Sequence, residues 1–292
     1  MISIVIISKD EPGIDDTLTA VTAQAQALQE PSEIVVVDAS DGRLDLIRRR
    51  HEPAVRWVQF RPPPGVRVSI PHQRNAGVRL VDGEIIVFTD AGCRPEPGWL
   101  QQLVLPLYQG EHVTAGLALT ASGDPGLYGR AIELARASRY LTECPTINLA
   151  FRRAAFDAVG GFDEGFAYGS DVDFSWRLID AGYGIRSVPD AVVLRSDWGT
   201  WRRQLRRSYA YGKARARLYR KHRARSRHVL RNDPTVVVYP VFLLGLPLTV
   251  IFPLYPALLL IPAWRNRSLG SARVLADHLI FGAGVLAELM SR

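Results

Sequence analysis

Cysteine and lysine are scarce in this chain of 292 residues. Its two cysteines, Cys93 and Cys144, are too few for the disulfide framework of a small secreted domain, and we expect both to be free thiols. With 47% apolar and 22% charged residues, the chain is too hydrophobic to be intrinsically disordered. Its length suits one large α/β domain, alone or with an appendage.

The first residues lack the basic region with which a secretory signal peptide begins. Met1 to Ile7 form a β-branched run that leads directly into Lys9, Asp10 and Glu11. This pattern predicts a buried first strand rather than a leader. We therefore expect this part of the chain to work on the cytoplasmic side.

Acidic residues are missing from one segment, and that absence explains the net charge of +7. Residues 202–231 contain 13 Lys or Arg and no Asp or Glu. Subtracting these 13 charges from +7 leaves −6 on the rest of the chain. Only three of the 36 basic residues are Lys, and arginine suits bidentate contacts with phosphate. The positive charge is thus one local block, which we call the basic block.

Short apolar runs alternate with helical stretches in the first half of the chain. Continuous runs of this kind predict a mostly parallel sheet that is covered by helices on both faces. The predicted strands are residues 2–7, 33–38, 55–60 and 84–89, with a helix over residues 14–29. Residues 61–71 and 122–126 are predicted loops because of their Pro and Gly content.

Three acidic positions stand out because ligands bind beyond the carboxyl ends of such strands. Asp38 and Asp90 each follow a predicted strand, and Asp171 begins a predicted helix that runs to Ala181, with Ser170 as its N-cap. Taken singly, each has an ordinary structural explanation as a turn former or as a partner of the helix dipole. Asp173, two residues after Asp171, is expected to be structural or to face an acceptor.

A charge-free stretch follows the basic block. Residues 236–264 contain no charged residue over 29 positions, but they contain five prolines. About 20 apolar residues suffice to cross a bilayer, so this stretch predicts membrane association. A second stretch, residues 274–290, carries Asp277, His278 and Glu288 and is expected to be interfacial or packed. Basic residues on both flanks of the first stretch favour a re-entrant hairpin over a single kinked crossing.

The order of these motifs resembles the family 2 glycosyltransferases, which have the GT-A fold. The resemblance covers residues 1–220 and depends on the ordered series rather than on one motif. Its pieces are Ser8-Lys9-Asp10-Glu11, Val35-Val36-Val37-Asp38-Ala39-Ser40, His72-Gln73-Arg74-Asn75-Ala76-Gly77, Phe88-Thr89-Asp90-Ala91-Gly92, Asn148-Leu149-Ala150-Phe151-Arg152-Arg153, Gly160-Gly161-Phe162-Asp163-Glu164, and the segment from Gly169 to Leu178.

The resemblance implies a role for each matching residue. Asp171 would be the general base that takes the proton of the acceptor hydroxyl in an inverting transfer. The donor would be a nucleotide sugar, which is the co-substrate. The residues that would bind it are Ser8, Glu11, Asp38, Arg74, Asn75 and Asp90. Members of the family hold Mg²⁺ or Mn²⁺ with an Asp-x-Asp pair and often a later His.

Two of these metal positions differ here, which makes a divalent cation doubtful. The second Asp is Gly92, and the expected His is Arg195. Asp90 alone is a poor site for a hard cation, although the donor diphosphate could supply the other ligands. We expect Arg94 or Arg195 to provide positive charge for the diphosphate instead.

The basic block begins with a sequence similar to the Gln-x-x-Arg-Trp element of processive members. Gln204 and Arg207 match that element and are candidates for contact with the diphosphate or the acceptor, while Ser208 replaces the Trp. The alternative is that both residues belong only to a helix at the membrane surface. Loss of the Trp is unfavourable for a processive polymer synthase.

Other function classes remain open at this point. A non-catalytic protein that binds a nucleotide sugar, or a nucleic-acid binder that uses Arg202 to Arg231 and the tyrosines among them, would also be basic. A nucleotidyltransferase would want a longer Gly-rich loop than Glu11-Pro12-Gly13. Because juxtamembrane basic runs attract anionic lipid, we expect lipid rather than nucleic acid as the partner.

The sequence thus predicts three parts. Residues 1–200 form a GT-A catalytic domain with a Rossmann-like sheet, its donor half about 1–92 and its acceptor half about 93–200. Residues 201–232 form a basic interfacial helix, and residues 233–292 a hydrophobic membrane-associated tail. The expected activity is sugar transfer from a nucleotide sugar to a lipid-linked or cell-envelope glycan acceptor, as in polysaccharide biosynthesis, at the cytoplasmic face of the cell membrane.

Overall fold

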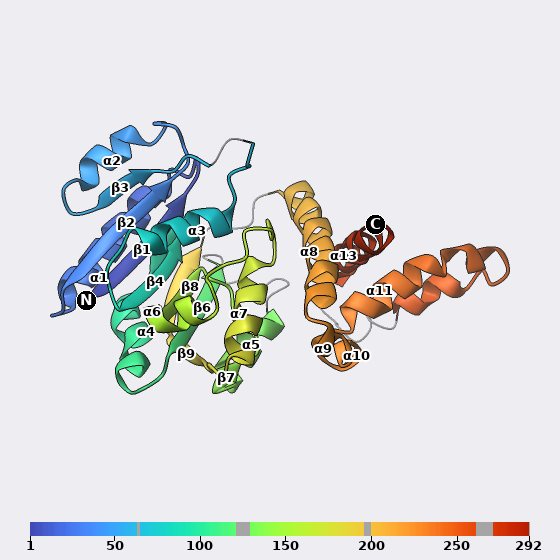
Figure 1. Ribbon diagram of the computed structural model, residues 1–292. Coiled ribbons are helices and arrows are strands. Elements are labelled where there is room, and N and C mark those ends of the chain that lie inside the picture. Colours follow the sequence, from blue (N-terminus) through green and yellow to red (C-terminus); the bar gives the residue numbers. More distant parts are fainter. Residues whose placement is uncertain (63–64, 121–128, 196–199, 261–270, 292) are drawn as a thin grey trace. The chain divides into compact units, whose positions relative to one another are not determined.

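The computed structural model describes residues 1–62, 65–120, 129–195, 200–260 and 271–291. The chain divides into two compact units, Met1–Asp197 and Trp198–Arg292. The division lies close to the predicted end of the catalytic domain. Figure 1 shows a sheet with helices in the first unit and helices alone in the second. The predicted loop at residues 122–126 lies outside the described residues.

The first unit is built on a nine-stranded sheet with the order β3-β2-β1-β4-β8-β6-β9-β5, and β7 pairs with β9. The β-branched runs of the sequence form its central strands, and all seven residues of β1 are buried. The strands are β1 (Ile2–Ser8), β2 (Ser32–Asp38), β3 (Arg56–Gln59), β4 (Ile85–Asp90), β5 (Cys93–Pro95), β6 (Val113–Thr120), β7 (Tyr140–Leu141), β8 (Asn148–Arg152) and β9 (Ile185–Arg195).

The first four strands in the order are parallel, as predicted. Their register sets Ser8 at the end of β1 beside Asp38 of β2, and Ile7 beside Asp90 of β4. Because β1 lies between the other two strands, Asp38 and Asp90 flank it at one edge of the sheet. This edge, where the parallel strands end, is where α/β sheets bind ligands.

The second half of the sheet is mixed, so the prediction of a mostly parallel sheet was wrong there. β8 runs antiparallel to both β4 and β6, whereas β6 and β9 are parallel to each other. Two reversals restore the original direction, so β9 ends at the same edge as β4. Strand direction depends on contacts between distant segments, which a hydrophobic run does not reveal.

Helices cover both faces of this sheet (Figure 1). One face packs against α1, α2 and α4, through residues such as Leu18 and Trp99, and the other packs against α3, α6 and α7, through residues such as Val78 and Phe174. The helices of this unit are α1 (Ile14–Ala27), α2 (Asp45–His51), α3 (Ile70–Arg79), α4 (Trp99–Tyr108), α5 (Gly129–Ala137), α6 (Arg153–Ala158) and α7 (Ser170–Asp180).

The helix α7 begins one residue earlier than predicted, and its cap differs. Gly169 is the N-cap, with a left-handed φ of 79°, and no side chain caps the helix. A left-handed turn favours glycine because it has no Cβ. Ser170 is therefore the first helical residue rather than the N-cap, and its side chain is buried.

The second unit consists of helices. The basic block forms α8 (Trp201–Lys221), α9 (Arg223–Ser226) and α10 (Val229–Asn232). The charge-free stretch forms α11 (Thr235–Leu244) and the 3₁₀ helices η2 (Leu246–Val250) and η3 (Tyr255–Leu259), and α13 (Ser271–Met290) completes the unit. Helix α13 packs against α8 and α11.

Glycine allows the backbones of α8 and α13 to approach closely. A Cβ on Gly212 would lie 2.0 Å from the carbonyl oxygen of Phe281, and one on Gly284 would lie 2.1 Å from that of Tyr209. Side chains at these positions would separate the helices. Among the described residues, no helix is both long enough and apolar enough to cross a membrane.

Candidate active site

The first turn of α3 connects the ends of β1 and β2. The side-chain amide of Gln73 donates hydrogen bonds to the carbonyl oxygens of Ser8 and Val37, both at 2.9 Å. Proline at the second helical position suits the start of a helix because it lacks an N–H that would need a partner. Gln73 thereby holds the start of α3 at the carboxyl edge of the sheet.

Two loops meet beside the end of β2. Ser40 Oγ donates to Asp38 Oδ1 at 2.5 Å, and the backbone N–H of Asp10 donates to Ser40 Oγ at 2.8 Å. Arg43 Nε also bonds Asp10 Oδ1 at 2.6 Å. Nearby, the hydroxyl of Ser8 is buried and has no hydrogen-bond partner among the described residues. Buried polar atoms are rarely left unpaired, so this hydroxyl marks a place for a ligand or water.

Arg74 lies beneath the end of β4. Its Nη2 donates to Asp90 Oδ1 at 2.8 Å, and its side chain is only 4% exposed, against 32% for Asp90. The guanidinium carbon lies 5.7 Å from the ring centroid of Phe88 and 5.9 Å from that of Phe162. A buried cation of this kind needs a counterion, and Asp90 provides it.

Asp171 lies in the first turn of α7, within electrostatic range of Arg74. Burial raises the pKa of the Asp171 carboxyl above its ordinary value, while the positive charge of Arg74 and the backbone N–H of Val172 oppose that rise. The negative charge of Glu143 adds a smaller upward effect. A carboxylate whose pKa is raised toward neutral is suited to general-base work. One arginine therefore acts on two carboxylates, Asp90 and Asp171.

Asn75 ties α3 to the loop before α7. Its Oδ1 accepts from the N–H of Phe162, and its Nδ2 donates to the carbonyl oxygen of Phe162 and to Glu164 Oε1, each at 2.9 Å. His72 Nε2 lies 3.2 Å from Glu164 Oε2. Asn75 is buried, and these contacts occupy both of its polar atoms.

Gly92 stands where a second carboxylate is expected, and the side chain of Glu11 fills that space. A Cβ on Gly92 would lie 3.3 Å from Glu11 Cδ. Gly92 has a φ of 82°, which strains any residue with a Cβ. The N–H of Gly92 donates to Thr17 Oγ1 at 3.0 Å, and Glu11 Oε1 accepts from the N–H of Gly13 at 3.1 Å.

The short strand β5 brings two arginines to the same edge. Cys93 is in register with Arg195 at the end of β9, and Arg94 with Leu194. Burial and the charge of Asp90 raise the pKa of the Cys93 thiol to about 12, and Arg195 lowers it. The side chains of Asp90 and Arg195 are thus both close enough to Cys93 to act on its thiol electrostatically. Arg94 is exposed.

The donor-side residues differ from an Asp-x-Asp and His set at two positions. Asp90 is engaged by Arg74, the second Asp position is Gly92, and the His position is the cation Arg195. In the part of the chain that the structure describes, no three His, Cys, Asp or Glu side chains are placed to hold a metal. The protein oxygens nearest to this position are those of Asp90 and Glu11, so a bound cation would need further oxygen ligands from the donor diphosphate.

Three residues singled out in the sequence have structural partners. Asp173 is fully buried, and its Oδ2 accepts from Arg177 Nε at 2.8 Å. Ser208 Oγ donates to Asp277 Oδ1, and Gln204 Nε2 lies 3.5 Å from the same oxygen, which directs Gln204 toward α13 within the second unit. Arg207 lies on the same helix, α8.

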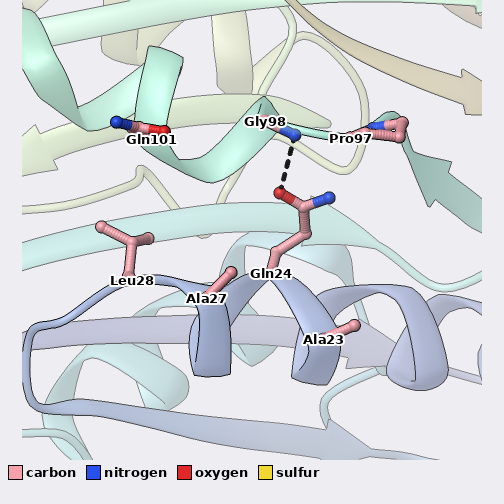
Figure 2. Close-up of a pocket in the computed structure, with 7 residues that line it drawn as sticks. All are labelled: Ala23, Gln24, Ala27, Leu28, Pro97, Gly98 and Gln101. Atoms are coloured by element: carbon pink, nitrogen blue, oxygen red, sulfur yellow. Dashed lines mark hydrogen bonds between the residues drawn. The ribbon is translucent and has the colours of Figure 1, made fainter.

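A shallow pocket of about 300 Å³ lies elsewhere, between the second half of α1 and the start of α4 (Figure 2). Gln24 Oε1 accepts a hydrogen bond from the N–H of Gly98 at 3.1 Å across it. Its lining contains no titratable side chain: Ala23, Gln24, Ala27, Leu28, Pro97, Gly98 and Gln101. It therefore has none of the chemistry found at the carboxyl edge of the sheet.

Gln73, Ser40 and Glu143 act at the site without having been predicted there. Ser40 and Gln73 lie within the matched motifs, next to Asp38 and Arg74, and this position was the available signal. Glu143 carries no local signal, because only the fold brings it near Asp171. The predicted residues Asp38, Arg74 and Asp90, by contrast, lie along one edge of the sheet.

Comparisons with known proteins agree with this arrangement. The sequence profile of glycosyl transferase family 2 matches residues 3–163, and that of glycosyl transferase family group 2 matches residues 94–265. A mannosyltransferase of Pyrobaculum calidifontis, solved in complex with GDP-Man and Mn²⁺, has a similar fold, with a TM-score of 0.70 at 19% identity. The match covers 100% of this chain and 87% of that one.

Curated relatives match part of the chain. The pre-mycofactocin glycosyltransferase of Mycobacterium tuberculosis is 30% identical over 165 residues, which are 51% of this chain and 34% of the relative. The glycosyltransferase AglE of Haloferax volcanii is 23% identical over 199 residues, 65% of each protein. The chain thus spans about a third of the length of the first of these relatives. With a GT-A-like mixed sheet and a profile that matches more than half of its residues, the chain belongs to glycosyltransferase family 2.

Proposed function

We propose that this protein transfers a sugar from a nucleotide-sugar donor to an acceptor hydroxyl with inversion at C1, and that Asp171 is the general base. The observation that carries the proposal is the position of Arg74. Its guanidinium bonds Asp90, at the edge where donors bind, and its charge also acts on Asp171. The expected base and the expected donor edge are therefore neighbours.

The proposed reaction is a single displacement. The acceptor oxygen attacks C1 of the donor sugar, and Asp171 takes the hydroxyl proton as the new C–O bond forms. The bond from C1 to the diphosphate oxygen breaks, and the nucleoside diphosphate leaves with that electron pair. A base with a raised pKa holds the proton well enough to assist the attack.

The nucleotide would bind where the loops after β1 and β2 meet. The unpaired Ser8 hydroxyl and the carboxylate of Asp38 support a hydrogen-bonded base or ribose there, and Glu11 borders the same edge. Asn75 has both of its polar side-chain atoms bonded to the loop around Phe162, and Arg74 bonds Asp90 beside the Phe88 and Phe162 rings. We assign them the positioning of Asp90 and of the loop around Phe162 rather than direct contact with the donor.

We also propose that arginine meets much of the charge on the leaving diphosphate. Arg195 and Arg94 support this, since both are near the end of β4 and guanidinium groups bind phosphate oxygens bidentately. Activity that is abolished by EDTA and restored by Mn²⁺ would contradict this assignment.

The acceptor and the location are part of the same proposal. We propose a lipid-linked or cell-envelope glycan acceptor, with the first unit on the cytoplasmic face of the cell membrane. The exposed apolar side chains and arginines of the second unit support this. We assign Gln204 to the packing of α8 against α13 within the second unit, together with Arg207 on the same helix. We do not expect nucleic acid as a partner.

The experiment is a donor screen followed by one substitution. Nucleotide sugars, with GDP-mannose first, are tested for thermal stabilisation and for hydrolysis, with and without Mn²⁺. With the donor found, Asp171→Asn should keep donor binding and lose transfer. Asp180→Asn, at the exposed end of the same helix, is the matched control and should keep both. A protein that binds donor and never transfers, with any acceptor tried, would be a non-catalytic binder.

A further inference from the structure

Residues 235–260 form a packed hairpin, which we call the apolar hairpin. Helix α11 ends before Gly245, the chain continues outward through η2, and it returns through η3. The rings of Phe242 and Tyr255 stack with centroids 5.1 Å apart, and the Tyr255 hydroxyl donates to the carbonyl oxygen of Phe242 at 3.0 Å. A Cβ on Gly245 would lie 2.0 Å from that hydroxyl oxygen. The two arms are thus built to pack together.

The outer surface of the apolar hairpin is hydrophobic throughout. Val250 and Ile251, near its tip, are 87% and 85% exposed. Other exposed apolar side chains continue this surface along both arms: Val238, Val241, Leu244, Leu246, Leu248, Phe252, Leu254, Leu258 and Leu260. Residues 236–260 contain no Asp, Glu, Lys or Arg. An apolar surface of this extent is typical of a binding surface rather than of one facing water.

Charged side chains are confined to the base of the apolar hairpin. Asp233, two residues before α11, pairs with Arg215 at 2.8 Å and accepts from Thr235 Oγ1 at 2.7 Å. Tyr239, in the second turn of α11, still has a polar partner, with its hydroxyl oxygen 3.0 Å from His278 Nδ1. Beyond Tyr239, the side chains are apolar apart from Thr249 and Tyr255.

Exposed arginines lie directly before the hairpin. Arg223, Arg227 and Arg231 are exposed on α9, on α10 and between them, and α10 contacts α11. A hydrophobic surface next to exposed cations matches the chemistry of an anionic bilayer, in which acyl chains lie behind negatively charged headgroups. A purely apolar protein partner would not explain the arginines.

The path of the hairpin limits how it can enter a bilayer. Its outgoing arm consists of α11, Gly245 and η2, which together span about 27 Å at about 1.5 Å per α-helical residue and about 2.0 Å per 3₁₀ residue. The hydrocarbon core of a bilayer is about 30 Å thick. Because the chain then turns back through η3, the hairpin enters and leaves a bilayer on the same side.

We propose that the apolar hairpin inserts as a re-entrant loop into an anionic phospholipid bilayer, with Arg223, Arg227 and Arg231 at the headgroups. The insertion anchors the chain without crossing the membrane. Vesicle binding requires no sugar donor. Membrane insertion can therefore fail while the proposed sugar transfer holds, and sugar transfer can fail while membrane insertion holds.

The test uses the full chain and vesicles of phosphatidylcholine with or without about a third phosphatidylglycerol. Wild-type protein should float with the anionic vesicles. The double variant V250E/I251E should lose about tenfold or more in binding, because it places two charges in hydrocarbon. Leu46→Glu is the matched control, since Leu46 is 78% exposed on α2, and it should bind as wild type does. The triple variant R223Q/R227Q/R231Q should bind more weakly and with less dependence on salt.

A depth measurement distinguishes insertion from surface binding. Ile251→Cys can be labelled selectively with an environment-sensitive fluorophore, because both native cysteines are buried. Nitroxide placed on the acyl chains should quench this label and should not quench one at Leu46→Cys. Failure of the wild type to bind vesicles, or loss of binding in the arginine variant alone, would overturn the proposal. So would a dimer in solution that V250E/I251E dissociates, because the surface would then bind a second copy.

Discussion

The buried ion pair between Arg74 and Asp90 provides the sharpest test of how the site is assembled. Replacing Arg74 by Met leaves Asp90 without its partner at 2.8 Å and removes the cation between Phe88 and Phe162. Breaking a buried pair costs about 3–5 kcal/mol, and the partial exposure of Asp90 places this pair near about 3 kcal/mol. In a domain of this size that corresponds to a fall of at least about 6 °C in Tm.

Three further variants isolate the cause. Arg74→Lys keeps the charge and should recover part of the loss, and R74M/D90N should be less destabilised than Arg74→Met because it leaves no unpaired carboxylate. Arg43→Met breaks the exposed pair with Asp10 and should change the free energy of unfolding much less than Arg74→Met does, because solvent screens that pair. Calorimetry and denaturant titration measure all four.

The same variants predict a change in the pH profile. Arg74 lowers the pKa of Asp171, which burial raises, and Glu143 and the Val172 N–H also act on that carboxyl. Without the arginine charge, the Asp171 pKa rises further, so the acid limb of kcat/KM should move to higher pH in Arg74→Met and stay near wild type in Arg74→Lys. An unchanged acid limb in Arg74→Met would refute the coupling of Arg74 to Asp171, whatever happens to Tm.

The remaining predictions use other parts of the molecule. Because the folded-state pKa of Asp171 lies above its unfolded value, the folded protein binds more protons and loses this stability as pH rises through the window between the two values. Asp171→Asn should therefore be at least as stable as wild type at pH 7, and this advantage should vanish near pH 4. Gly77→Ala should destabilise the fold by about 1–3 kcal/mol in urea, because its Cβ would lie 2.4 Å from Val5 Cγ1, and an unchanged midpoint would contradict that packing. Arg195→Gln should raise the KM for donor more than Lys9→Gln does, and should make the activity more responsive to Mn²⁺.

The central strands and the site edge could be predicted from the sequence because they depend on local pattern. The β-branched run of β1 and the strand ends at Asp38 and Asp90 are visible as hydrophobic runs followed by acidic residues. The reversed direction of β8 is not visible, because its short apolar run, residues 149–151, is compatible with either direction. For the same reason, the pairing of β5 with β9, which brings Arg195 to Cys93, appears only in the structure.

The burial of polar residues on α3 also escapes sequence reasoning. Arg74 and Asn75 match a donor-binding motif, and polar residues on a helix that covers a sheet are ordinarily exposed. Here the fold supplies partners for both, Asp90 for Arg74 and the Phe162 backbone for Asn75, and these partners lie far away in the sequence. Likewise, the charge-free stretch is long enough for a crossing, yet in the structure it forms α11, η2 and η3, the arms of a hairpin.

The most direct test of the central claim measures Asp171→Asn with the donor that the screen identifies. Donor affinity is measured by titration calorimetry and transfer by product formation, with Asp180→Asn alongside. The account predicts a Kd within about threefold of wild type and a loss of kcat of about 10²–10⁴-fold, since general-base catalysis is worth that much. Transfer at a rate near wild type by Asp171→Asn, with donor affinity intact, would contradict it.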